Sequence, residues 1–142
     1  MPNILHEVTI EASPDKVYEA ITTQDGASNW WTIHSKAEPK EGTISEFGFY
    51  GGQVVFKMLV DTLEPARKVA WDVEQGAPDG SWADTRVIWD LTPVENGTRV
   101  LFAHRGFASE DGNYANVSYN WAWFLTSLKA YLETGTGTPN TN

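Results

Sequence analysis

The feature that most constrains the fold is a long amphipathic segment near the end of the chain, at residues 116–133. Its apolar residues, which recur at steps of three and four, are Val117, Trp121, Phe124, Leu125, Leu128, Tyr131 and Leu132. On a helix they form one broad stripe that another layer must cover. Gly135 and Gly137 follow the segment and Pro139 prevents the helix from resuming, which predicts an end near residue 134.

Nearly everything before this helix is patterned as β-strands, so a sheet is the layer that covers the stripe. Residues 3–11 alternate apolar and polar side chains, which is typical of a half-buried strand. About six more strands are predicted after residue 31, and those with clear bounds are 43–50, 53–63, 68–74, 84–92 and 98–107. The predicted class is α+β, with a curved antiparallel sheet of about six to seven strands wrapped around one long C-terminal α-helix.

Two short helices are predicted between the first strand and the rest of the sheet. Ser13 is suited to the N-cap of the first helix and Pro14 to its first turn. Asp25-Gly26 is expected to break that helix, and a second short helix or turn covers residues 27–31. A tight turn at Gly51-Gly52 is expected to join two strands, and residues 75–83 and 108–113 are expected to be loops.

The charge of the chain limits the partners that it can bind. The formal net charge of −9 at pH 7 argues against nucleic acid, whose phosphates require clustered Lys and Arg, and equally against an anionic membrane surface. No apolar run approaches the length that crosses a bilayer. The chain has no cysteine and does not open with a secretory pattern, so we expect a cytoplasmic protein. Its 142 residues predict a single domain over residues 1–134 and a loose tail over 135–142.

Four stretches, in a fixed order, span almost the whole chain. They are Ser13-Pro14 with Val17, Ala20 and Ile21; Trp30-Trp31-Thr32 with Glu41-Gly42; Gly97-Thr98-Arg99-Val100 with His104-Arg105-Gly106-Phe107; and Trp121 with Tyr131-Leu132-Glu133-Thr134-Gly135. Together they resemble the START-like superfamily (SRPBCC), whose architecture is called a helix-grip fold. More narrowly, the chain resembles the bacterial branch named after the activator of heat-shock-protein-90 ATPase.

That resemblance implies a hydrophobic cavity between the concave face of the sheet and the long helix. Members of the superfamily bind lipids, plant hormones or polyketides, some catalyse cyclisation or ring hydroxylation, and some are chaperone partners. A fold that hosts so many functions does not determine one of them.

Aromatic side chains and one histidine are the candidates for lining such a cavity. The chain has seven Trp, five Tyr and six Phe, more than a core of this size requires, and ligand sites are mostly apolar with a few polar groups. The alternative, for at least half of these rings, is that they fill the core. The candidate ligand-binding residues are Trp30, Trp31, Phe49, Phe56, Trp71, Trp89, His104, Phe107, Trp121 and Phe124.

His104 is the best single candidate for a catalytic residue, ahead of the strand carboxylates Glu46, Asp72, Asp84 and Asp90, which are expected to face solvent. It follows Val100 and Phe102 on an apolar strand face, where it can orient a ligand carbonyl or act as general acid or base near neutral pH. The alternative is a structural histidine that ties the end of the strand to a loop. His34 is expected in an irregular, solvent-facing stretch. Isolated histidines, the lack of cysteine and the lack of any ligand spacing argue against a metal, and no cofactor is expected.

Three functions from different classes fit these features. The leading hypothesis is a non-enzymatic binder of a hydrophobic small molecule (lipid-, aromatic- or polyketide-like), held between sheet and helix, with the loops at 75–83 and 108–113 as a gate. The second is a cyclase, dehydratase or hydrolase acting on an aromatic or polyketide-like substrate, with His104 as acid or base. The third is a co-chaperone-like interaction domain, which predicts a large exposed apolar patch and a filled interior. Neither the ligand nor the oligomeric state follows from the sequence.

Overall fold

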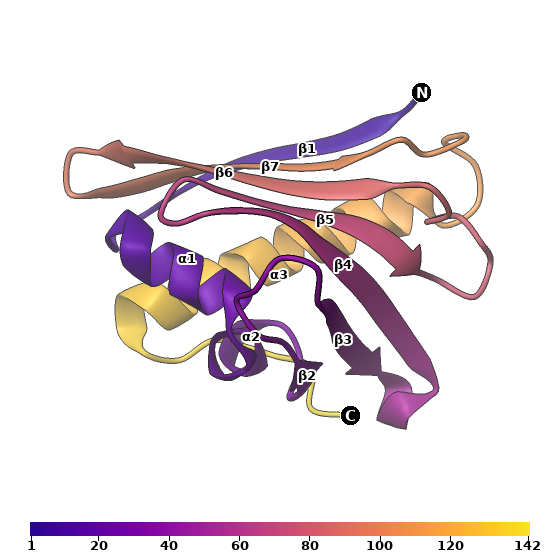
Figure 1. The fold of residues 1–142 in the computed structure, drawn as a ribbon, viewed down its shortest axis with the longest axis horizontal. Coiled ribbons are helices and arrows are strands. Elements are labelled where there is room, and N and C mark those ends of the chain that lie inside the picture. Colours follow the sequence, from indigo (N-terminus) through magenta and orange to yellow (C-terminus); the bar gives the residue numbers. More distant parts are fainter.

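A curved antiparallel sheet of seven strands forms one layer of the protein, and a long C-terminal helix packs against it (Figure 1). The computed structural model describes residues 1–142, and the strands lie in the order β1-β7-β6-β5-β4-β3-β2. The strands are β1 (Asn3–Ile10), β2 (His34–Lys36), β3 (Ile44–Phe49), β4 (Val54–Glu64), β5 (Lys68–Gln75), β6 (Arg86–Val94) and β7 (Gly97–Arg105). The helices are α1 (Pro14–Thr22), α2 (Gln24–Trp30), the short 3-10 helix η1 (Tyr50–Gly52) and α3 (Tyr114–Thr134). The predicted α+β class is confirmed.

The two short helices meet at a residue that caps both of them. The side chain of Ser13 accepts a hydrogen bond from the backbone N–H of Lys16 and caps α1 as predicted. The hydroxyl of Thr23 donates to a carbonyl of α1 and accepts from the N–H of Gly26, 3.0 Å away, so Thr23 is the N-cap of α2. Asp25-Gly26 therefore lies inside α2, and the predicted break there is wrong. Glycine is required at position 26 because a Cβ would lie 2.6 Å from the Cα of Ala20, where the two helices touch.

Two details of the sheet differ from the prediction. His34 is exposed, but it lies in the short edge strand β2, where it pairs with Gly48 of β3. The connection between β3 and β4 is the 3-10 helix η1, in which Tyr50 and both following glycines have positive φ, instead of a two-residue turn. This wider connection carries the ring of Tyr50 out to the surface, where the residue is 71% exposed.

The helix α3 begins two residues before the predicted stretch and ends where the glycine pattern indicated. Gly135 adopts a left-handed φ of 89°, and its N–H donates to the carbonyl of Tyr131. Val117, Trp121 and Leu125 are buried along one face of the helix. That face packs on aromatic side chains of the sheet, since the rings of Trp121 and Phe102 lie 4.5 Å apart between centroids. The helix and the sheet therefore share one core.

The tail, residues 135–142, is not loose as the sequence predicted. Asn140 pairs with Thr32 in a parallel bridge, and its backbone N–H donates to the carbonyl of Trp31 over 2.8 Å. The buried hydroxyl of Ser127 donates to the carbonyl of Trp30 and accepts from the N–H of Thr138. These hydrogen bonds fix the tail between the end of α2 and the middle of α3.

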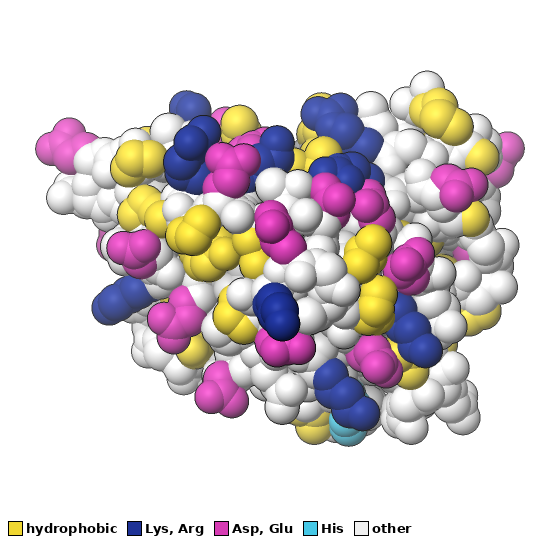
Figure 2. Space-filling model, in the orientation of Figure 1, with side chains coloured by type: hydrophobic (Ala, Val, Ile, Leu, Met, Phe, Trp, Pro, Cys, Tyr) yellow, Lys and Arg dark blue, Asp and Glu magenta, His cyan; other side chains and the backbone are white.

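Tryptophan and phenylalanine side chains fill much of the interior between sheet and helices. Trp30, Trp71 and Trp89 are almost wholly buried, and the rings of Trp71 and Trp89 meet edge to face at 5.9 Å. On the face shown in Figure 2, acidic and basic side chains are interspersed and hydrophobic side chains lie only in small groups between them. None of the helices has the length and apolar character needed to span a membrane.

Candidate functional site

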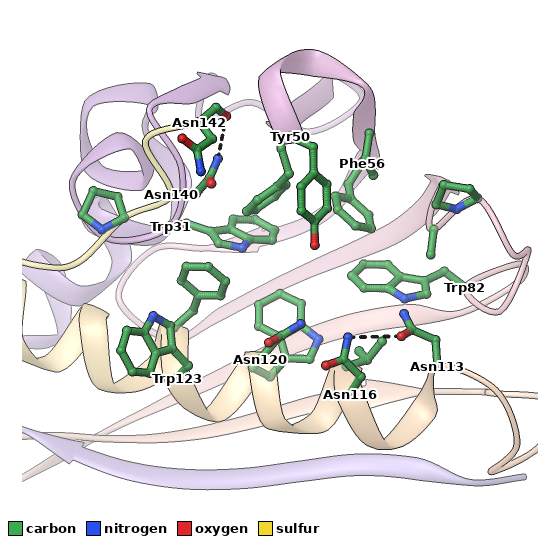
Figure 3. A pocket seen from close by; sticks show the side chains of 18 of the residues that line it. Trp31, Tyr50, Phe56, Trp82, Asn113, Asn116, Asn120, Trp123, Asn140 and Asn142 are labelled. Carbon is green, nitrogen blue, oxygen red and sulfur yellow. Dashed lines mark hydrogen bonds between the residues drawn. The ribbon is translucent and has the colours of Figure 1, made fainter.

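A pocket of about 570 Å³ opens between α3, the β3–η1–β4 connection, the loop 76–85 and the tail (Figure 3). Its volume is typical of small-molecule sites, which range from about 300 to 1,000 Å³. Each wall comes from a different part of the chain. The pocket therefore exists only because the sheet, the helix and the tail are brought together.

Aromatic rings form the continuous part of the wall. The ring of Phe56 lies 4.5 Å from Trp82 and meets Phe49 edge to face at 5.5 Å. The ring centroids of Trp31 and Trp121 lie 5.2 Å apart, and this contact connects the rim of the pocket to the core. Rings packed in this way present flat apolar surfaces to a ligand.

The polar part of the wall consists mainly of asparagine side chains. Asn113, Asn116 and Asn120 follow one another at steps of three and four residues, so they lie along the same side of α3 (Figure 3). The side-chain amide of Asn116 donates to the side-chain oxygen Oδ1 of Asn113 over 3.2 Å. Across the pocket, the amide of Asn140 donates to the hydroxyl of Thr32. These groups can donate and accept hydrogen bonds, but they do not ionise.

No charged or titratable side chain other than the phenol of Tyr50 lines the pocket, although the chain carries a net charge of −9. The lining side chains thus include no cationic partner for an acidic ligand. No group of three or more His, Cys, Asp or Glu side chains is placed to hold a metal ion.

Trp82 is the pocket residue that the sequence analysis did not single out. It lies in the loop 76–85, yet it is only 5% exposed. Gly76 lies so close that a Cβ added there would be 2.2 Å from the Cβ of Trp82. The carboxylate of Asp79 accepts hydrogen bonds from the N–H and hydroxyl of Ser81, which order the loop and lower the pKa of Asp79. The indole nitrogen of Trp82 is buried and has no hydrogen-bond partner.

His104 does not lie in the pocket. Its imidazole is fully buried, and both ring nitrogens are engaged. The indole N–H of Trp121 donates to Nδ1 over 3.1 Å, so Nδ1 is unprotonated and Nε2–H donates to the hydroxyl of Thr85, 2.9 Å away. The hydroxyl of Thr85 in turn donates to the carbonyl of Trp82. Burial lowers the pKa of His104 to about 3, so this imidazole is neutral in the native protein.

The other predicted site residues divide into two groups. Those that line the pocket are Trp31, Phe49, Phe56, Trp121 and Phe124. Those that pack in the core, outside the pocket, are Trp30, Trp71, Trp89 and Phe107 together with His104. Large flat rings fill much of the space between sheet and helix, and the pocket of about 570 Å³ lies toward the rim of that space. That the five lining residues bind a ligand stays a prediction.

Several functional candidates were missed because their signal is weak in the sequence. The asparagines of α3 have helical spacing, but polar residues on a helix are ordinarily interpreted as its solvent-exposed face. A tryptophan inside a loop rich in glycine, proline and aspartate is a clearer signal for Trp82. The contribution of the tail could not be predicted, because it depends on a long-range bridge between Asn140 and Thr32.

Comparison with known proteins identifies relatives with the same architecture. A family model described as "Activator of Hsp90 ATPase homolog 1-like protein" matches residues 11–133. The Aha1 dimer from Colwellia psychrerythraea, solved in solution, is 38% identical; the match covers 96% of this chain and 100% of that one with a TM-score of 0.87. A comparison with curated proteins gave no match.

Two more distant structures share the fold alone. Protein SSP2350 from Staphylococcus saprophyticus is 16% identical, with a TM-score of 0.81 over 99% of this chain and 98% of that one. DynU16, from the dynemicin biosynthetic locus, is 24% identical, with a TM-score of 0.80 over 95% of this chain and 48% of that one.

Proposed function

The chain belongs to the Activator of Hsp90 ATPase homolog 1-like family, and from this premise we propose that it binds an uncharged, largely aromatic small molecule in the pocket beside α3. The observation that carries the proposal is the composition of the wall, which combines aromatic rings with asparagines and has no ionised side chain. A wall of this kind favours a flat neutral molecule, because it stacks against rings and does not compensate the desolvation of a charge.

The expected affinity follows from the apolar area that a ligand can bury. A ligand that buries about 400 Å² of apolar surface gains roughly 10 kcal/mol at about 25 cal/mol per Å². Association costs at least about 4 kcal/mol, which leaves a dissociation constant of roughly tens of micromolar. A single-ring compound buries too little surface to bind measurably, so the natural ligand has several rings or an equivalent chain.

The two other hypotheses receive less support from the arrangement. An acid–base enzyme needs a titratable group in contact with substrate, and His104 is sealed in the core away from the pocket. An interaction domain was expected to have a filled interior, whereas a pocket of about 570 Å³ opens here. Distant structural similarity to DynU16, from a biosynthetic locus, is compatible with a role in small-molecule metabolism.

Fluorescence titration with the neutral dye N-phenyl-1-naphthylamine tests the proposal. Its emission rises in an apolar site, so the wild-type protein should bind it saturably at tens of micromolar. Asn120→Trp fills the pocket from α3 and should weaken binding strongly. Tyr119→Trp adds the same ring at the next residue, which is 68% exposed and outside the pocket, and should bind as the wild type does. The proposal fails if the wild type does not bind the dye, or if Asn120→Trp binds it unchanged.

A further inference from the structure

The indole nitrogen of Trp82 is a hydrogen-bond donor without a partner in the wall of the pocket. Two other buried indole nitrogens are paired, since Trp30 donates to the carbonyl of Ala20 and Trp121 to His104. Trp89 is likewise unpaired, but it lies outside the pocket. A buried donor without a partner is uncommon in proteins and indicates a missing acceptor.

The ring of Trp82 is held so that its nitrogen cannot turn to another partner. Phe56 and His104 pack on the ring at 4.5 Å each, the latter edge to face. Its backbone carbonyl accepts from the hydroxyl of Thr85 over 2.6 Å, which fixes the residue at the base of the loop. The donor is therefore set in place before any ligand arrives.

The nitrogen edge of the ring faces the side of the pocket where the first asparagines of α3 lie (Figure 3). Asn116 is exposed and Asn113 is half-buried, so their side chains can rotate without disturbing the core. Only the oxygen of Asn113 is engaged by Asn116, which leaves the amide hydrogens of Asn113 free to donate. Rotation of these side chains would uncover the buried indole N–H of Trp82 for an acceptor atom of a ligand.

The charge of the pocket wall limits the kind of acceptor that can bind to the indole N–H of Trp82. A carboxylate or phosphate is bound most strongly by Arg or Lys, and neither residue type lines the pocket. The net charge of −9 further disfavours an anion. We infer that the indole N–H of Trp82 recognises a neutral carbonyl-type oxygen on the aromatic ligand, an inference that rests on the proposed function and specifies its ligand class.

A matched pair of ligands isolates this interaction. 9-Fluorenone and fluorene have the same tricyclic skeleton, and only the first carries a carbonyl oxygen. Each is titrated against the protein loaded with N-phenyl-1-naphthylamine, and displacement of the dye gives its dissociation constant. The wild type should bind fluorenone about fivefold more tightly than fluorene, the effect of one neutral hydrogen bond.

Trp82→Phe keeps an aromatic ring and removes the N–H, so it should bind both compounds with equal affinity. Any change in the shape of the pocket affects both ligands and cancels in the ratio. Tyr119→Phe removes a polar group from an aromatic ring outside the pocket, at a residue that is 68% exposed, and should retain the preference for fluorenone.

The outcomes separate the two proposals. Equal binding of both compounds by the wild type, or a preference that survives in Trp82→Phe, overturns the assignment of Trp82 and leaves the binding function standing. If the dye binds and neither compound displaces it, the carbonyl class is wrong. If the dye itself does not bind, the proposed function fails.

Discussion

Acidification is expected to destabilise the protein through His104, because the fold holds this imidazole neutral. Its Nδ1 accepts from the indole of Trp121 and its Nε2 donates to Thr85, so a second proton would set two donors against each other at Nδ1. Between its ordinary pKa of 6.5 and the native pKa of about 3, the unfolded chain binds a proton at His104 that the native protein does not. Stability is therefore complete above pH 6.5 and is lost as the pH falls toward 3.

The size of this effect follows from the linkage between proton binding and folding. Each pH unit inside the window removes about 1.4 kcal/mol from the free energy of unfolding. Between pH 6.5 and pH 4.5, His104 alone should account for a loss of about 2–3 kcal/mol. That is a large share of the stability of a small domain, which is about 5–15 kcal/mol.

Urea unfolding followed by tryptophan fluorescence measures the loss, at pH 7 and at pH 4.5, in the wild type and in His104→Gln. Glutamine does not titrate, and its amide can donate to Thr85 or accept from Trp121. Carboxyl groups whose pKa is lowered by hydrogen bonds, such as Asp79 and Glu133, also lose stability on acidification, but they do so in both proteins.

The wild type should therefore lose about 2–3 kcal/mol more than His104→Gln over this interval. Equal losses in the two proteins would refute the reasoning, since they would mean that His104 is accessible to protons in the native state.

Three substitutions test the packing around the pocket. Ser127→Ala leaves the carbonyl of Trp30 and the N–H of Thr138 unpaired, so it should lower the free energy of unfolding in urea by about 1–3 kcal/mol and weaken dye binding. Unchanged dye binding would show that the tail does not form part of the binding site. Gly76→Ala drives a methyl group against Trp82 and should cost about 1–3 kcal/mol while also weakening dye binding, and an unaffected dye affinity would contradict the tight contact. Gly135→Ala forces alanine into a left-handed φ of 89° and should cost about 1–2 kcal/mol without any change in dye binding, so a loss of binding would contradict its assigned role as a helix cap alone.

Regular elements could be predicted from the sequence because their periodicity is local. The stripe that includes Val117, Trp121 and Leu125 predicted α3, and Gly135 predicted its end, since each signal depends on residues within a few turns. The break expected at Asp25-Gly26 was wrong because glycine is needed there for the close approach of α1, a tertiary requirement that local propensity does not contain.

The candidate site could be predicted only in part. Sequence alone indicates that aromatic residues gather between sheet and helix, but it does not separate rings that fill the core from rings at the rim. Trp30 and Trp31 are adjacent and their rings stack 5.6 Å apart, yet only Trp31 lines the pocket. Trp82 and the tail were missed because their positions depend on a loop and on a long-range bridge between Asn140 and Thr32.

The most direct test of ligand binding is an NMR titration of the ¹⁵N-labelled protein with 9-fluorenone. The account predicts that the backbone amides of Ala77 and Asn116 and the indole N–H of Trp82 shift in a saturable manner. Leu5 and Leu101, which are exposed on the sheet at 60% and 40%, should not shift. Shifts confined to those two leucines and their neighbours, or no shifts around the pocket, would contradict it.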